Sequence, residues 1–248
     1  MLSRLALLAT LCAGCALADG AGHGPPVAAW LEDPTDIYPH DVLGDVPEHL
    51  VLAARDADGT EYRRDLRDVI GPPSVFEDIA PRLVDATGDG RADIVVVESA
   101  LDAGAQLSVY TLRSGELVKV AATPHIGTPF RWLAPVAVAD LDGNGVIDLA
   151  YVETPHIAPT LKVWTWGAGG LTEVAQMEGV TNHRIGENFI SGGLRDCGMG
   201  PQMVLADKDW RYIQIVTLSR DGLLNRDTHP IPANAKGFDE VMSCNTGF

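Results

Sequence analysis

The sequence predicts an all-β protein, folded as a small β-propeller or as a propeller-like arc of four to five four-stranded blades. Short runs in which apolar and polar residues alternate with period two recur along the chain, and glycine-containing turns separate them at intervals of roughly 8–12 residues. No segment sustains a helical period of apolar residues. The chain also repeats itself, with a period close to the length of one four-stranded blade.

The repeat is seen when four aspartates that open turn-rich loops are aligned. Asp41, Asp85, Asp140 and Asp196 are separated by 44, 55 and 56 residues. The first unit is included because HDVLGDVPEHLVLAA keeps the frame of VDATGDGRADIVVVE, although its loop differs. These intervals predict four units that begin near residues 37, 79, 134 and 189, within a single domain over residues 19–248.

Each unit contains runs of strand-like residues in the same order. In the second unit an apolar run, residues 79–84, leads into the loop, and a β-branched run follows at residues 94–97. An alternating run at residues 106–112 and a short run at residues 117–122 flank the turn RSGE. Four short antiparallel strands per unit are therefore expected. The third unit repeats this order at residues 134–139, 149–152, 160–166 and 171–176.

The C-terminal stretch FDEVMSC, residues 238–244, resembles FEDIAPR at residues 76–82, which opens the second unit. We therefore expect the last strand to complete the first blade and close a ring; a tail lying over the last blade is the alternative. Cys197 and Cys244 are the two cysteines outside the N-terminal stretch. In an exported protein such a pair usually forms a disulfide, which would fasten the tail; two buried thiols are the alternative.

The N-terminal stretch MLSRLALLATLCAGCALADG has the pattern of a secretory signal peptide. One arginine, Arg4, precedes an apolar run that is too short to span a bilayer, and small residues at Ala16 and Ala18 suit a cleavage site. We expect cleavage after Ala18, so that residues 1–18 are removed and the protein is periplasmic or extracellular. Lipidation at Cys15 is the alternative.

The charge of the exported chain limits its partners. Without Arg4, 17 lysines and arginines remain against 34 aspartates and glutamates, which gives a formal charge of −17. Such a surface repels phosphate backbones and anionic lipid headgroups, which argues against nucleic-acid and membrane-surface partners. No further apolar stretch of the sequence is long enough to span a membrane. The acidic composition favours cations instead.

The loop of the third unit, VADLDGNGVID, places oxygen-bearing side chains at alternate positions of a glycine-rich turn. Hard oxygen ligands that converge on one point suit Ca²⁺, which takes about six to eight of them. Asp, Asn and Gly are turn residues in any case, so a metal-free turn is the alternative. An EF-hand is excluded because its last ligand position holds Tyr151 instead of Glu, and the following residues are strand-like. The predicted ligands are Asp140, Asp142, Asn144, the carbonyl of Val146, and Asp148.

The second unit contains a looser copy of this loop, VDATGDGRAD. Its third position is Thr87, a neutral and weaker ligand than the aspartate at the same place in the third unit. The fourth unit keeps only Asp196, and the first has His49 where the last aspartate belongs, so neither is expected to bind the ion. The predicted ligands in the second unit are Asp85, Thr87, Asp89, the carbonyl of Arg91, and Asp93.

The run VAVADLDGNGVIDLAYV resembles the FG-GAP (VCBS-type) repeat of β-propellers, which integrin α-chains and many secreted bacterial proteins contain. The resemblance is good over residues 79–112 and 132–166 and poor in the first and fourth units. It implies Ca²⁺ in the loop that joins the first two strands of a blade, with the side chains named above as ligands. The usual ring of seven blades cannot be built from the 230 residues that follow Ala18, so four or five blades or an open arc are expected.

The sequence contains none of the motifs GxSxG and HExxH, no P-loop, and no GxGxxG between a strand and a helix. In an antiparallel blade, successive loops alternate between the two ends of the strands, an argument called strand parity below. One group of residues falls in loops that this alternation places at one end of the blades, opposite the metal-like loops. Imidazole and guanidinium groups there would form an anion- or transition-metal-binding rim; scattered turn histidines and surface arginines are the alternative. The group is His125, Arg131, His156, His183, Arg184 and Glu187.

These observations predict an exported, calcium-binding β-propeller that serves as a binding or scaffold module for a protein, a glycan or a small acidic ligand, with no catalysis assigned. A cell-envelope enzyme of the polysaccharide lyase or phosphoesterase type, working at the rim, is the alternative. A purely structural or adhesive repeat protein is a third alternative. Fold class does not decide among them, because one fold hosts many functions.

Overall fold

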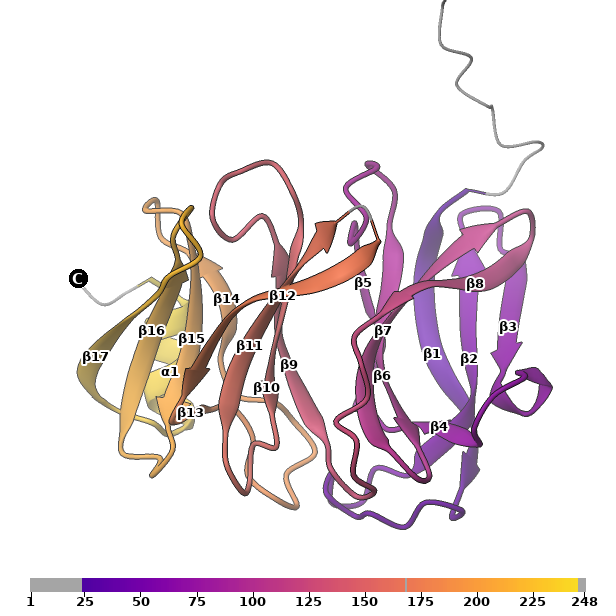
Figure 1. The fold of residues 1–248 in the computed structure, drawn as a ribbon, viewed down its shortest axis with the longest axis horizontal. Helices are drawn as coiled ribbons and strands as arrows, with labels where there is room; N and C mark the ends of the chain where they lie inside the picture. Colours follow the sequence, from indigo (N-terminus) through magenta and orange to yellow (C-terminus); the bar gives the residue numbers. More distant parts are fainter. Residues whose placement is uncertain (1–23, 168, 245–248) are drawn as a thin grey trace, which may run out of the picture.

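The computed structural model describes residues 24–167 and 169–244. These residues form three antiparallel sheets, one short 3₁₀ helix and one α-helix (Figure 1). The all-β class predicted from the sequence is therefore confirmed. Within the described part of the chain, no helix is long and apolar enough to cross a membrane. The predicted signal peptide, residues 1–18, and the alternative lipidation site at Cys15 lie outside the described residues.

The first sheet has eight strands and combines the first two predicted units. Its main path runs in the order β1-β2-β4-β6-β7-β8, with β3 paired to β2 and β5 paired to β6. The two units are joined because Phe76 in β4 pairs with His49 of β2 on one side and with Glu98 of β6 on the other. The elements are β1 (Pro26–Thr35), β2 (Glu48–Asp56), β3 (Glu61–Asp65), the 3₁₀ helix η1 (Leu66–Asp68), β4 (Ser74–Phe76), β5 (Arg82–Val84), β6 (Asp93–Ala100), β7 (Gly104–Arg113) and β8 (Glu116–Ala122).

The third and fourth units each form a sheet of their own. The second sheet has the order β12-β11-β10-β9, and the third has the order β13-β15-β16-β17 with β14 paired to β15. Neighbouring sheets contact each other through β8 and β12, β7 and β9, and β9 and β14. The strands are β9 (Leu133–Ala139), β10 (Asp148–Glu153), β11 (Thr160–Gly167), β12 (Gly170–Glu178), β13 (Val180–Thr181), β14 (Gly193–Asp196), β15 (Pro201–Asp207), β16 (Tyr212–Leu218) and β17 (Leu224–Pro232).

The predicted four to five separate four-stranded blades are wrong in number, because the structure has three sheets of eight, four and five strands. None of these three sheets closes on itself. The order of strands within a unit is as predicted: β6, β10 and β15 follow the loops, and the alternating runs form β7, β11 and β16. Local sequence patterns thus predicted where these strands lie. They did not predict that β4 pairs with strands of both the first and the second unit and so joins them into one sheet.

Apolar cores fill the spaces within and between the sheets. β6 is buried along its whole length, which explains its near-continuous run of valines. One core cluster, which includes Leu107 and Leu149, joins the first and second sheets, and another, which includes Val163 and Met203, joins the second and third. Burying one such side chain contributes about 1.5–3 kcal/mol, so these clusters are what hold the sheets together.

The C-terminal stretch that was predicted to be a strand is instead the helix α1 (Ala235–Met242). The side chain of Asn234 accepts a hydrogen bond from the backbone N–H of Gly237, which is the arrangement of a helix N-cap. Phe238 and Val241, three positions apart, lie on one helix face and are buried against the third sheet. The expected ring closure by a last strand is therefore wrong, because helical spacing buries these apolar residues on the last sheet.

The disulfide between Cys197 and Cys244 is confirmed, with Cα atoms 5.6 Å apart. It links the loop that follows β14 to the residues just after α1. Both cysteines therefore belong to the third sheet and its helix. The bridge fastens the tail to the last unit and not to the first, which corresponds to the alternative of a tail lying over the last blade.

The loops fall at two opposite ends of the sheets. The pairing of β9 with β10 places Asp148 opposite Ala139 and Glu153 opposite Leu133. The β9–β10 loop consequently lies at one end, and the segments before β9 and after β10 lie at the other. In Figure 1 the first end is uppermost and the second is lowermost. The two candidate sites of this protein are separated by this arrangement.

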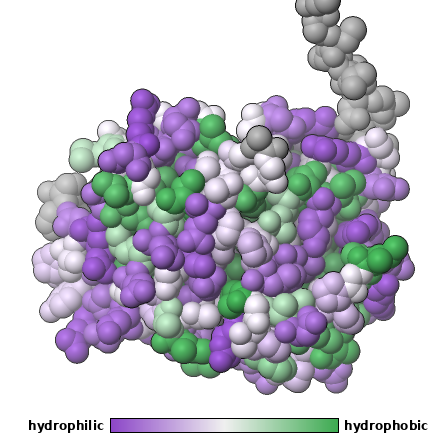
Figure 2. All heavy atoms as spheres, viewed as in Figure 1, coloured by the Kyte–Doolittle hydropathy of each residue, from purple (hydrophilic) through white to green (hydrophobic). Residues whose placement is uncertain are grey.

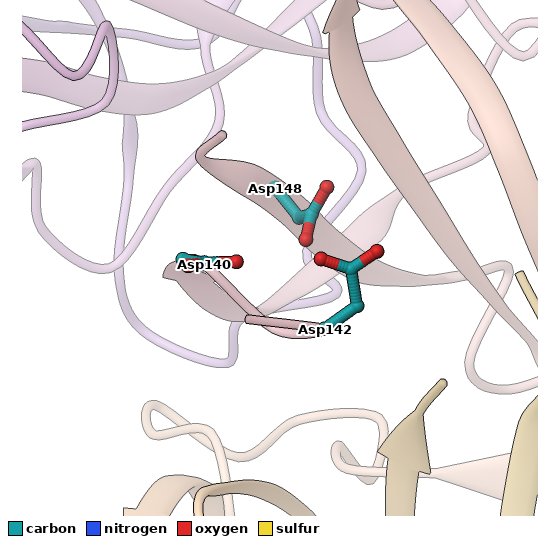
Figure 3. Close-up of side chains that lie close together, drawn as sticks. All are labelled: Asp140, Asp142 and Asp148. Carbon is teal, nitrogen blue, oxygen red and sulfur yellow. The ribbon is translucent and has the colours of Figure 1, made fainter. Parts of the chain in front are cut away.

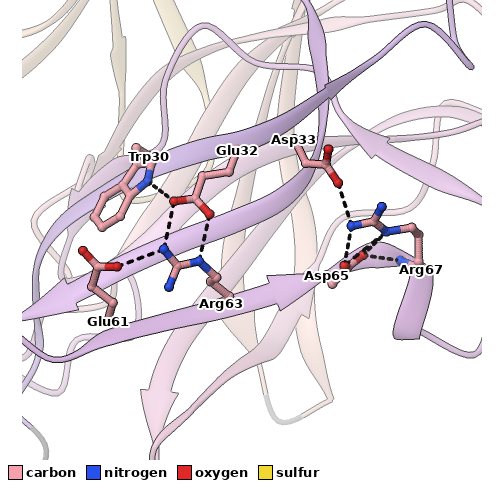
Figure 4. Close-up of polar contacts among 7 residues, drawn as sticks. All are labelled: Trp30, Glu32, Asp33, Glu61, Arg63, Asp65 and Arg67. Carbon is pink, nitrogen blue, oxygen red and sulfur yellow. Dashed lines mark hydrogen bonds and ion pairs between the residues drawn. The ribbon is translucent and has the colours of Figure 1, made fainter.

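The face in view in Figure 2 is largely hydrophilic, with apolar side chains in scattered groups. On the first sheet, charged side chains of β1 and β3 meet across β2 (Figure 4). They can do so because the residue of β2 that lies between Trp30 and Arg63 is the small Ala53. Exposed ion pairs of this kind add little stability, because water screens them. Arg63 of β3 pairs with Glu32 of β1 and with Glu61 of its own strand, and Arg67 of η1 pairs with Asp33 of β1 and Asp65 of β3.

Candidate functional site

The loop between β9 and β10 brings three carboxylates together. Asp140, Asp142 and Asp148 each offer one oxygen, and these oxygens lie within 4.8 Å of one another (Figure 3). Two of the side chains come from the start of the loop, and Asp148 is the first residue of β10. Among the described residues, this is the only group of three or more acidic, histidine or cysteine side chains with ligand atoms so close.

Local hydrogen bonds shape the loop around these carboxylates. Asp140 accepts the backbone N–H groups of Asn144 and Gly145, both at 2.9 Å, and Asp142 accepts that of Asn144 at 3.0 Å. Gly143 and Gly145 have φ angles of 74° and 88°, a region that favours glycine. The alternation of acidic residues with glycine therefore lets the chain turn tightly while its carboxylates point inward.

Asp148 differs from the other two carboxylates because it is buried, with 1% of its surface exposed. Its Oδ2 accepts the backbone N–H of Leu141 at 3.0 Å, which ties β10 to the loop. Burial, and then the charges of Asp142 and Asp140, raise the pKa of the Asp148 carboxyl. The loop therefore concentrates negative charge that a cation would offset.

The donor set fits Ca²⁺. Because Ca–O distances are about 2.3–2.6 Å, two oxygens on opposite sides of one ion are at most about 5 Å apart, and the three carboxylates meet this limit. A carboxylate oxygen that accepts one N–H keeps a further lone pair for a metal. Asn144 lies beside the cluster, since its Nδ2 donates to Asp142 at 3.0 Å and its Oδ1 accepts the N–H of Val146 at 2.7 Å.

The loop between β5 and β6 is built in the same way. Asp85 accepts three backbone N–H groups of its own loop, at 2.7–3.1 Å. Asp89 Oδ1 accepts the N–H of Arg91 at 2.9 Å, just as Asn144 does two residues before Val146. The repeat predicted from the sequence thus extends to individual hydrogen bonds of the two loops.

Asp93 occupies the position in the β5–β6 loop that Asp148 occupies in the β9–β10 loop. It is fully buried, and its Oδ2 accepts the N–H groups of Ala86 and Thr87 and the Thr87 hydroxyl, at 3.0–3.1 Å. Its Oδ1 is buried without a hydrogen-bond partner among the described residues, which is unfavourable unless an ion or water reaches it. The acidic side chains of this loop are not as close together as those of the β9–β10 loop.

Each of the two loops is also held by the sheet that follows it. Nε1 of Trp166, in β11, donates to the carbonyl of Ala86 at 2.5 Å. Nη2 of Arg220, in the turn after β16, donates to the carbonyl of Gly143 at 2.5 Å. Neither contact could be predicted from the sequence, because no local pattern links a tryptophan or arginine to a loop about 80 residues upstream. The loops are therefore parts of the junctions between sheets.

At the opposite end, two of the predicted rim histidines are in direct contact. His156 Nε2 and His183 Nδ1 are 2.8 Å apart, and Nε2 of His183 is 2.8 Å from the carbonyl oxygen of Glu187. Because a carbonyl only accepts, Nε2 of His183 holds the proton, and neutral His183 then accepts at Nδ1 from His156. Burial lowers the pKa of both imidazoles, that of His156 to about 4. Both rings are therefore neutral near pH 7.

His125 and Arg131 lie at the same end but have contacts of their own. His125 Nδ1 donates to the carbonyl of Gly104 at 2.7 Å, and the side chain borders a small pocket of about 130 Å³ beside Glu98. Arg131 Nη1 donates to the carbonyl of Phe130 at 2.8 Å. The structure thus brings together His156 and His183, and it gives His125 a separate environment.

Arg184 and Glu187 are near the histidine pair, and they interact with each other at 3.3 Å. The guanidinium of Arg184 lies 3.8 Å from the ring centroid of Trp210 and donates to the carbonyl of Ala233 at 3.2 Å. These contacts fasten the loop before β14 to the third sheet. The Arg184 side chain therefore contacts the third sheet and its own loop. Of these two residues only Glu187 bonds to the histidine pair, through its backbone carbonyl.

His40, Glu77 and Trp132, which the sequence did not indicate as site residues, complete the cluster around the two histidines. His40 Nδ1 is 2.5 Å from Oε1 of the buried Glu77, and burial raises the pKa of Glu77. Nε1 of Trp132 donates to the Glu77 carbonyl at 2.8 Å, and its ring stacks on His156 with centroids 6.3 Å apart. His40 lies in the weakest copy of the repeat, so no aligned position marked it.

Residues 69–151 match the family model of the FG-GAP-like repeat. The matched segment contains the β5–β6 loop, strands β6 to β9 and the β9–β10 loop, so both metal-like loops lie inside it. The resemblance inferred from the run VAVADLDGNGVIDLAYV is confirmed. No curated protein and no solved structure matches the chain.

Proposed function

We propose that this chain, which contains an FG-GAP-like repeat over residues 69–151, is an exported β-sheet module that binds Ca²⁺ in the β9–β10 loop and holds a partner molecule. The observation that supports the proposal most directly is the convergence of Asp140, Asp142 and Asp148 within 4.8 Å. The β5–β6 loop is the weaker site, because its acidic side chains are not as close together and the neutral Thr87 stands where the other loop has Asp142.

In this proposal the ion has a structural role. It would join the start of the β9–β10 loop to the first residue of β10, where Asp148 is buried. Arg220 of the third sheet holds the same loop through Gly143, so ordering the loop also orders the junction between the second and third sheets. A ligand that binds only the folded state stabilises it by mass action, by about 2.7 kcal/mol at 100 times its Kd.

Export and binding are supported by two further features. A disulfide such as Cys197–Cys244 persists in oxidising compartments, which agrees with a periplasmic or extracellular location. The formal charge of −16 disfavours nucleic acid and anionic lipid as partners and leaves a protein, a glycan or a small ligand. A module of this kind acts by presenting loops from a rigid set of sheets.

Calcium binding is tested by thermal melting and titration calorimetry of the disulfide-bonded chain, with Ca²⁺ and with a chelator. Ca²⁺ should raise the melting temperature, and Asp148→Asn should remove most of that gain. The substitution keeps the size of the side chain and its acceptor for Leu141, so the loss would report the missing charge. Asp102→Asn, in the exposed turn between β6 and β7, is the matched control. A melting temperature that is unchanged by chelator, together with no bound Ca²⁺ by metal analysis, would refute the proposal.

A second candidate function is an enzyme of the cell envelope. It would work at the end of the sheets where His156 and His183 lie, called the histidine end below. One observation favours it: His156 donates from Nε2 to His183, so Nδ1 of the neutral His156 keeps its lone pair, as a general base requires. Polysaccharide and phosphoester substrates test this candidate, with His156→Gln as the diagnostic variant. Turnover that the variant retains in full would remove the histidine end as its site.

A further inference from the structure

A pocket on the outer face of the third sheet is separate from both sites described above. Its volume is about 290 Å³, near the lower limit of small-molecule pockets, roughly 300 Å³. Helix α1 covers the neighbouring part of this face through Phe238 and Val241, and the pocket is the part left open beside the helix end. Its floor contains two cross-strand pairs, Arg195 with Gln202 and Thr217 with Asn225.

Arg195 is the buried cation of this pocket, with 8% of its surface exposed. Its Nε donates to Oε1 of Gln202 at 2.9 Å, and its Nη1 donates to the carbonyl of Val241 at 2.5 Å, in the last turn of α1. Both acceptors are uncharged. The guanidinium therefore has a structural role, because it holds the end of the helix on β14.

These contacts leave the charge of Arg195 without a counterion. Burial lowers the pKa of Arg195, and no carboxylate among the described residues acts on it in the opposite direction. Withdrawing a charge from water is unfavourable unless an opposite charge pairs with it. The end of α1 offers only partial negative charge, and Nη2 of Arg195 has no acceptor among the described residues.

Among the described residues, Arg195 is the one arginine whose side chain faces this pocket. Arg226 also borders it, but alternation along β17 turns its side chain to the other face of the sheet, where Nη1 donates to the carbonyl of Glu178 at 3.4 Å. Asp227 is the one acidic side chain among the described lining residues. Asp227 is 79% exposed and lies 3.4 Å from His229, so its charge is largely screened by water. A buried arginine without a counterion stands out in a chain whose formal charge is −16.

We propose that this pocket binds a small oxyanion, such as a carboxylate or a sulfate-like tetrahedral group, with Arg195 as the buried anchor. The planar fork of a guanidinium presents parallel N–H groups that match two oxygens of such an anion. The amides of Gln202 and Asn225 and the hydroxyl of Thr217 are donors for the remaining oxygens. The anion supplies the counter charge that Arg195 lacks.

The proposal is tested by titration calorimetry of the disulfide-bonded chain with sulfate and, separately, with acetate, at constant ionic strength. The two arms distinguish a tetrahedral oxyanion from a planar carboxylate. We expect saturable binding of at least one of them with a stoichiometry of one. Arg195→Gln should weaken it about tenfold, the usual effect of losing a charged hydrogen bond, and Thr217→Val, which removes a hydroxyl donor and keeps the β-branched shape, should weaken it several-fold. Arg113→Gln, at the exposed end of β7, is the matched control and should leave binding unchanged.

Two variants are needed because Arg195 also holds α1. Circular dichroism and urea melting establish whether Arg195→Gln is folded; if it is not, Thr217→Val decides the question. Saturable binding that Thr217→Val weakens, while Arg113→Gln does not, supports the pocket as the site. Absence of saturable binding for both anions, or binding that is equal in the wild type and Thr217→Val, overturns the proposal.

Discussion

Acidification should weaken this protein through the contact between His156 and His183. The pair lies where segments of all three sheets meet: His156 follows β10, His183 precedes β14, and the loop of His183 bonds to Val42 of the first sheet through Gly186. A proton on His156 would place a charge against the ring of Trp132 and a second imidazole. The titratable and charged groups around the pair are His40, Glu77, Arg184 and Glu187.

The magnitude follows from the pKa of His156, which burial, and then the charges of His183 and His40, lower from 6.5 to about 4. Between these values the unfolded chain binds more protons than the folded one, so stability rises with pH across the window. The contribution is complete above about pH 6.5 and is lost as the pH falls toward 4. Between about pH 7.5 and pH 4.5 the loss from His156 amounts to about 2–3 kcal/mol.

The assay is urea denaturation of the wild type and His156→Gln at about pH 7.5, 6.5, 5.5 and 4.5. Glutamine keeps a donor for His183 but does not titrate. The raised pKa values of Glu77 and Asp148 act with the opposite sign, since those folded carboxyls bind protons more readily, and they are common to both proteins. The difference between the two pH profiles therefore isolates His156. Parallel profiles over this range would refute the reasoning.

Two further predictions concern the C-terminal tail. Cys244→Ser should lower the free energy of unfolding by about 2–4 kcal/mol, because the bridge joins residues 47 apart; a loss well below 1 kcal/mol in urea melts would contradict this. Gly237→Ala would stabilise a free helix by up to about 1 kcal/mol, but here a Cβ would overlap the carbonyl oxygen of Pro232. We expect a net destabilisation of about 1–3 kcal/mol, and an equal or higher melting temperature would show that α1 does not dock as described.

The β9–β10 loop shows why one candidate site could be predicted. Its proposed ligands lie within nine residues, and the same alternation that sets the sequence spacing sets the turn. The hydrogen bonds from Asn144 and Gly145 to Asp140 are local, so they follow once the turn forms. What the sequence did not contain is the support from Arg220, which reaches the loop only because the third sheet packs beside the second.

The histidine end shows the limit of the same reasoning. Strand parity assigned His125, His156 and His183 to one end, yet parity says nothing about distances within that end. His156 and His183 meet because both pack against Trp132, whereas His125 is drawn to the carbonyl of Gly104. Which side chains touch depends on the packing between sheets, and the alternation of residues along one strand does not record it.

The sequence by itself determined the all-β class, the positions of the strands in each repeated unit, the disulfide pair and the convergence of the β9–β10 loop. These features depend on periodicity, turn chemistry and composition, which act over a few residues. The tertiary structure alone decided that β4 joins two units into one sheet, that residues 235–242 form a helix, and that Arg195 is buried beside it. Each of these depends on apolar surface that a distant part of the chain must cover. The sequence around a residue buried in that way does not show that it will be buried.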